Sequence, residues 1–158
     1  MRSAVSLFFT SVFVTLGLSG LAAGDPAPAV GLGAELRALA ELEGVPALAS
    51  AARAMAAARR ATDEAGAQLW QELLSQEGDA DHAFRWTSAN RAAVERAKTR
   101  FRVRKARYLA AVEDLRAAAA QSPDLAPLSA RCRAERDRCE TDASAFRCAP
   151  LLPLCLAQ

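Results

Sequence analysis

Four cysteines are the residues of this sequence whose type and spacing most clearly indicate chemistry. Cys132, Cys139, Cys148 and Cys155 all lie in the last 27 residues, separated in turn by six, eight and six residues. Structural zinc sites usually contain closely spaced knuckles such as Cys-x2-Cys, and none is present here. An even number of clustered cysteines in an exported chain is typical of disulfide bonds. We therefore predict two disulfides and no metal or cofactor.

Helix geometry discriminates among the three ways of pairing these cysteines. Residues 128–142 read as a helix, in which Cys132 and Cys139 would lie about 10 Å apart along one face. A disulfide needs Cα atoms within about 7 Å, so this pair is disfavoured. An antiparallel return of the chain favours the nested set, with Cys139–Cys148 inside Cys132–Cys155. Two prolines at 150 and 153 predict an extended returning tail, and for that reason the crossed pairing stays open.

A run of basic residues is the second feature that could bind a partner. Six cationic side chains fall within ten residues without an intervening acid: Lys98, Arg100, Arg102, Arg104, Lys105 and Arg107. Such a run predicts a face for an anionic partner, and the alternative is a solvated helix surface in an Arg-rich chain. Nucleic acid is the usual partner of a basic patch, but an exported protein rarely meets it. We expect an acidic protein or an anionic envelope surface instead.

Acidic and aromatic side chains cluster between the two longest predicted helices. They are Glu77, Asp79, Asp81 and His82, with Phe84 and Trp86 nearby and Trp70 on the other side. Carboxylates and an imidazole can hold a divalent cation, but the EF-hand pattern fails because Ala83 and Phe84 stand where it needs an oxygen ligand and a glycine. We interpret this segment as a polar connecting loop, with both tryptophans in the core.

Catalytic vocabulary is scarce. His82 is the sole histidine, and the sequence contains no GxSxG, HExxH or phosphate-binding glycine loop. The sequence therefore predicts a protein that is not an enzyme and has no evident small-molecule substrate.

The N-terminus has the pattern of a secretory signal peptide. Arg2 precedes an uncharged stretch from Ala4 to Leu21, and small residues Ala22 and Gly24 stand where a signal peptidase would cleave before Asp25. We predict residues 1–24 as the signal peptide, with an uncleaved membrane anchor as the alternative. The protein is accordingly expected to be periplasmic or secreted.

The rest of the chain has the composition of an all-α protein. Alanine supplies 39 of the 158 residues, aromatics are only 6 %, and the net charge is +2. Few β-branched or aromatic residues are available to cover a sheet, whereas Ala, Leu, Arg and Glu are strong helix formers. We predict a flexible lead-in over 25–33, a short helix over 34–43, long helices over 46–77 and 88–121, and a disulfide-linked C-terminal segment over 122–158.

Heptad spacing relates the two long helices to each other. Large side chains recur every seven residues and mostly small ones follow at an offset: Leu48, Met55, Thr62 and Leu69 with Ala51, Ala58 and Ala65; then Val94, Phe101, Tyr108 and Leu115 with Ala97, Arg104, Ala111 and Ala118. This pattern predicts a long antiparallel, coiled-coil-like helical hairpin, although a compact bundle would share it. We expect a binding or scaffolding factor of the bacterial envelope. A cytokine-like secreted bundle and a membrane-anchored coiled coil are the alternatives.

Overall fold

The computed structural model describes residues 31–75 and 88–158, and every regular element in them is a helix. In chain order these are α1 (Leu32–Glu43), α2 (Ala49–Leu74), α3 (Ser88–Gln121), α4 (Ala126–Asp142), α5 (Ala145–Cys148) and α6 (Leu151–Leu156). The all-α prediction is confirmed. The predicted signal peptide and the loop over 78–87 lie outside the described residues.

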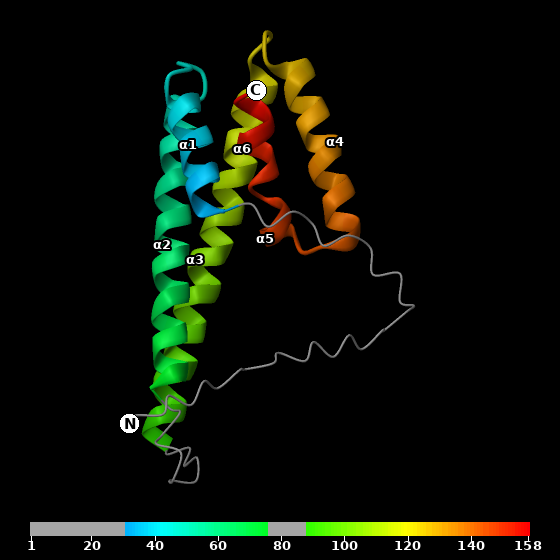
Figure 1. Cartoon of the computed structure of the whole chain (residues 1–158). Coiled ribbons are helices and arrows are strands. Elements are labelled where there is room, and N and C mark those ends of the chain that lie inside the picture. The colour runs from blue at the N-terminus through cyan, green and yellow to red at the C-terminus, as the bar shows by residue number, and fades with distance from the viewer. Residues whose placement is uncertain (1–30, 76–87) are drawn as a thin grey trace, which may run out of the picture.

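A long antiparallel pair, α2 and α3, forms the backbone of the molecule (Figure 1). At 1.5 Å per residue the two helices are about 39 and 51 Å long. The predicted seam is present, since Leu48, Met55, Val94 and Leu115 are buried in it. The elongated hairpin expected from the heptads is therefore confirmed, with the other helices gathered at one end.

One irregularity in the predicted seam has a packing explanation. Gly66 interrupts the alanine-rich α2, where a glycine costs helix stability. A Cβ at this position would lie 3.4 Å from the ring of Phe101, so the ring of α3 packs directly over the glycine backbone. Arg104, by contrast, was expected in the seam but lies exposed at its edge.

The helices at the other end build a lobe, by which we mean α1, α4, α5 and α6 together with residues 45–59 and 108–121. α1 packs on α2 and α6, and α4 packs on α3 and α6. One buried cluster runs through all these parts and includes Leu39, Met55, Val112, Cys132 and Leu152. The hydrophobic core is thus continuous across the boundary at residues 121–122.

The C-terminal tail is helical, so the prediction of an extended tail was wrong. Pro150 is the N-cap of α6 and Pro153 is its third residue. The N–H groups of a helix's first turn have no partner within the helix, so a proline there removes no hydrogen bond. The tail can then bury Leu152 and Leu156 against α1 and α4.

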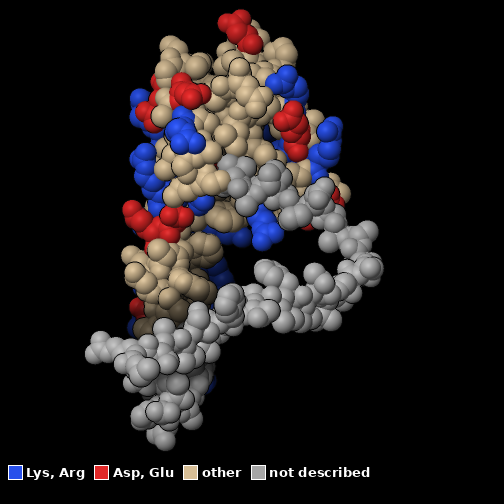
Figure 2. All heavy atoms as spheres, viewed as in Figure 1, with Lys and Arg blue, Asp and Glu red and all other residues tan. Residues whose placement is uncertain are grey.

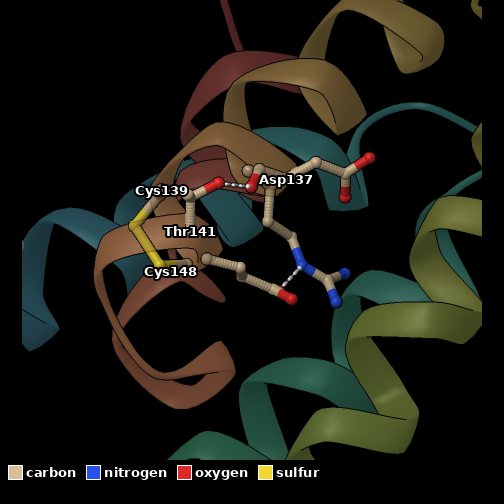
Figure 3. The surroundings of a disulfide bond; sticks show 6 residues. Asp137, Cys139, Thr141 and Cys148 are labelled. Carbon is tan, nitrogen blue, oxygen red and sulfur yellow. Dashed lines mark hydrogen bonds and ion pairs between the residues drawn. A yellow bond between two sulfur atoms is a disulfide. The ribbon is translucent and has the colours of Figure 1, made fainter.

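Two disulfides join the tail to α4 in the nested pattern. Cys132 bonds Cys155 with Cα atoms 5.6 Å apart. Cys139 bonds Cys148, the disulfide drawn in Figure 3, with Cα atoms 5.8 Å apart. Cys132 and Cys139 are seven residues apart in α4, and Cys148 and Cys155 are seven residues apart in the tail, which in each case is two helical turns. Because α4 and the tail are both helical, the difference in rise per residue expected for an extended tail does not arise. Disulfides of this kind indicate an oxidising compartment outside the cytoplasm.

Candidate binding surface

The distal part of the hairpin extends beyond the lobe, and α5 reaches only its upper end, where Phe146 contacts Phe101 and Lys105 (Figure 1). We call residues 60–75 and 88–107 the arm. Its α3 segment carries eight basic residues and one acidic residue, whereas its α2 segment carries one basic and three acidic ones. The arm is therefore a positively charged projection, and its charge comes from α3.

Helix geometry divides the cations of the arm between two flanks. At 100° per residue, positions 98, 102 and 105 fall on one side of α3, whereas 100, 104 and 107 fall on the other. Lys105 shows which side is which, because its ammonium lies 5.0 Å from the ring centroid of Phe146 in α5. We call its side the lobe-side flank, to which Arg91 also belongs, and the opposite side the open flank, to which Arg96 also belongs. The six-residue basic run is thus not a single face.

The open flank contains a shallow groove between the two helices. Two adjoining hollows of about 370 and 260 Å³ share Gln68 and Arg100. Arg104 lines the second hollow, but Glu64 and Glu72 of α2 also line the groove. Both signs of charge meet here, so the groove is a mixed polar surface rather than an anion site.

The lobe-side flank combines cations with exposed apolar side chains. Trp70 lies eleven residues, about three turns, after Arg59, which contacts the lobe, so the two lie on the same side of α2. Trp70 is 62 % exposed and Leu74, one turn later, is 45 % exposed. Trp70 was expected in the core, and this expectation was wrong because α3 is the only described helix that packs on that end of α2. Figure 2 shows basic side chains at the step where the lobe meets the arm.

The two acids nearest this flank are already engaged. Glu95 accepts a hydrogen bond from Lys98 at 2.8 Å, and this bond and the charge of Lys98 lower the pKa of Glu95. Asp63 lies 4.0 Å from the guanidinium of Arg59. Within the described residues no carboxylate forms an ion pair with Arg91 or Arg102, although the charge of Arg102 also helps to lower the pKa of Glu95. Both guanidinium groups can therefore still accept an external anion as a partner.

A buried polar cluster, missed by the sequence analysis, holds α1 and α5 against the hairpin inside the lobe. Glu35 is 0 % exposed, accepts a hydrogen bond from Arg59 Nε at 2.8 Å and accepts another from the hydroxyl of Tyr108. The guanidinium carbon of Arg59 lies 5.6 Å from the ring centroids of both Tyr108 and Phe146. Burial and the negative charge of Glu35 raise the pKa of Tyr108, so its hydroxyl stays a donor. This cluster joins α1, α2, α3 and α5.

The sequence holds one signal for this cluster. Glu35, Leu39 and Leu42 are spaced i, i+4 and i+7, which places the carboxylate on the buried stripe of α1. A lone acid on an apolar helix face needs a partner in the core. Local spacing does not reveal that Arg59, which is 24 residues away along the chain, is the partner of Glu35.

A second ionic network holds α4 to α3. Arg136 lies 2.6 Å from both Glu113 and Glu140, and Arg116 lies 2.7 Å from Glu113. Burial opposes ionisation of Glu113, but the hydrogen bonds from Arg136 and Arg116 outweigh it and lower its pKa. The neighbouring groove of about 370 Å³ between α3 and α4 is lined mainly by alanines and serine, with its cations Arg116 and Arg133 paired. It therefore offers no unmatched charge.

Residues 31–75 and 88–158 contain no group of three or more potential metal ligands, and the carboxylates and histidine of the predicted connecting loop lie outside these ranges. Of the helices described, none combines the length and apolar character needed to cross a bilayer. No protein-family model, curated protein or solved structure matches this chain.

Proposed function

We propose that this protein is an exported, non-enzymatic binding factor of the bacterial envelope and that the arm is its contact surface. The observation that carries the proposal is the structural difference between the two ends of the hairpin. One end of the hairpin is consolidated by a continuous core and two disulfides. The other end projects as a bare helical pair with a strong positive charge and exposed Trp70, Leu74 and Val103.

The proposal also draws on the sequence. A predicted signal peptide and a disulfide-linked tail support work outside the cytoplasm. The absence of catalytic motifs supports binding rather than chemistry. The partner is expected to be a protein or an anionic envelope surface, because both provide negative charge in that compartment.

Site-specific photo-cross-linking in intact cells tests this proposal. A photoreactive amino acid is placed singly at exposed alanines of the arm, Ala67, Ala92 and Ala106, and at matched exposed alanines of α4, Ala130 and Ala134. We expect discrete adducts, or lipid adducts, from the arm positions and none from α4. Adducts confined to α4, or none at any position, would contradict the proposal.

A further inference from the structure

The lobe-side flank has the dimensions of a docking site for one helix. Arg91, Lys98 and Lys105 follow one another at seven-residue intervals, so they span about 21 Å along one side of α3. Trp70 and Leu74 flank them from α2. We call this strip the shelf; it runs from Arg91 to Lys105 and includes Lys98, Arg102, Trp70 and Leu74. An α-helix of about 14 residues matches its length.

The lobe limits what can reach the shelf. α5 rises from the same side of the hairpin, because the ring of Phe146 stacks on Arg59 and Lys105 at the upper end of the shelf. α4 stands next to α3 on that side, bound through Arg136 and Glu113 (Figure 1). A flat bilayer would meet the lobe before lying along the shelf, whereas a single helix is only about 10 Å wide and can lie along the arm beside the lobe.

The charge and polarity of the shelf specify the kind of helix. Arg91 and Arg102 have no described ion-pair partner, and the local acid Glu95 is already bonded to Lys98. Two exposed apolar side chains one turn apart provide a hydrophobic anchor beside the cations. The complementary ligand therefore has carboxylates along one edge and leucine-like side chains along the other.

We propose that the shelf binds an acidic amphipathic helix of a partner protein. This inference rests on the proposed function and narrows it to one flank and one partner class. The apolar side of the ligand helix covers Trp70 and Leu74, and its Asp or Glu side chains pair with Arg91 and Arg102. Lys98, which is bonded to Glu95, lies between these two cations. Guanidinium groups suit this role because they bind carboxylates in a bidentate manner.

Two triple variants of α3 provide a matched comparison. R91Q/K98Q/R102Q removes three charges from the shelf, and R96Q/R100Q/R107Q removes three charges from the open flank of the same helix. Trp70→Ala removes the apolar anchor. Far-ultraviolet circular dichroism of each variant confirms that the helices are retained. All variants are made in the full mature chain.

The probe is a labelled synthetic 14-residue helix with Glu on one face and Leu on the other, and a peptide with Lys in place of Glu is its control. Binding is measured by fluorescence anisotropy at low and physiological salt, and Trp70 emission is followed in a Trp86→Phe background. We expect the acidic peptide to bind, with a blue shift of Trp70 emission. The shelf triple variant should weaken binding about tenfold, since each exposed ion pair supplies a modest part. The open-flank triple variant should change binding less than threefold.

Parallel measurements with phosphatidylglycerol vesicles separate this inference from the proposed function. Vesicle binding that depends on the shelf, without peptide binding, would overturn the inference and leave an anionic-surface function standing. Equal weakening by both triple variants would show that net charge, not the shelf, is recognised, and would also overturn it. Absence of peptide binding together with adducts from the arm would reject the shelf while keeping the arm as contact surface.

Discussion

At the scale of single residues, the buried carboxylate of Glu35 is the most consequential feature. It is enclosed in the core, and Arg59 and Tyr108 supply its two hydrogen bonds from different helices. Breaking a buried pair on one side costs more than the pair itself contributes, because the remaining charge is left without solvation. The cluster therefore makes the position of α1 depend on α2 and α3.

Replacing Tyr108 by Phe should lower the free energy of unfolding by about 1–3 kcal/mol, because one oxygen of a buried carboxylate loses its donor. The ring contact with Phe146, 5.7 Å between centroids, remains in this variant, so the loss reports on the hydroxyl. Urea unfolding at neutral pH measures it. An unchanged midpoint would show that Glu35 does not rely on this donor.

The loss of stability caused by Tyr108→Phe should depend on pH. The raised pKa of Tyr108 means that the folded protein keeps the phenolic proton while the unfolded chain loses it near pH 10. Above about pH 10 the unfolded state binds fewer protons, so wild-type stability falls as pH rises. Tyr108 is the sole tyrosine of the sequence. The difference between wild type and Tyr108→Phe should therefore shrink above pH 10, and a constant difference would contradict this.

At the scale of elements, the two disulfides have unequal surroundings. Cys132 and Cys155 are buried within the core cluster, whereas Cys139 is only half-buried at the far end of α4. The bonds also close loops of different length, with sequence separations of 23 and 9. Both differences make the first disulfide the more important one for stability.

Replacing Cys132 and Cys155 by Ala should destabilise the protein more than replacing Cys139 and Cys148. Chain entropy alone predicts a difference of about 0.8 kcal/mol, and lost packing in the core adds to it. Chemical unfolding of the two double variants under non-reducing conditions gives the comparison. If the second pair proved the costlier, the core position of the first would not be the deciding factor.

The elements were largely predictable because their signals are local. Heptads and the cysteine spacing predicted the long helices and favoured the nested disulfides, and the structure confirms them. The tail was wrongly predicted to be extended because proline breaks a helix in its interior but not in its first turn, where both prolines of the tail lie. The Glu35 cluster was missed because its partners lie 24 and 73 residues away. Distances of that kind are set by packing, which the local pattern does not contain.

At the scale of the whole molecule, the coverage of the α2–α3 seam by other helices decreases along the long axis. Near the lobe the seam of α2 and α3 is covered by further helices, and Met55, Tyr108 and Leu115 are fully buried. Along the arm, beyond the contact of Phe146 with Phe101 and Lys105, the two helices have only each other among the described elements, and Leu69 is half-buried. Local opening therefore costs less toward the tip of the arm.

Amide hydrogen exchange should reveal this gradient. Residues 66–74 and 88–97 are expected to exchange markedly faster than residues 50–56 and 108–119, although all four segments are helical. Mass spectrometry of peptides from the oxidised protein measures the rates. Uniform protection along both helices would mean that the hairpin opens only as a unit.

The seven-residue spacing of the cysteines has a consequence for the order in which the chain is oxidised. The short loop brings Cys139 and Cys148 together about four times more readily than the long loop joins the other pair, from the dependence of loop closure on length. Once this bond exists, Cys132 and Cys155 each lie two helical turns from it along adjoining helices. The second closure then needs only the winding of α4 and of the tail. The Cys139–Cys148 bond thus forms first and holds the two segments together. Helix formation in the export compartment then brings Cys132 and Cys155 together as the native pair.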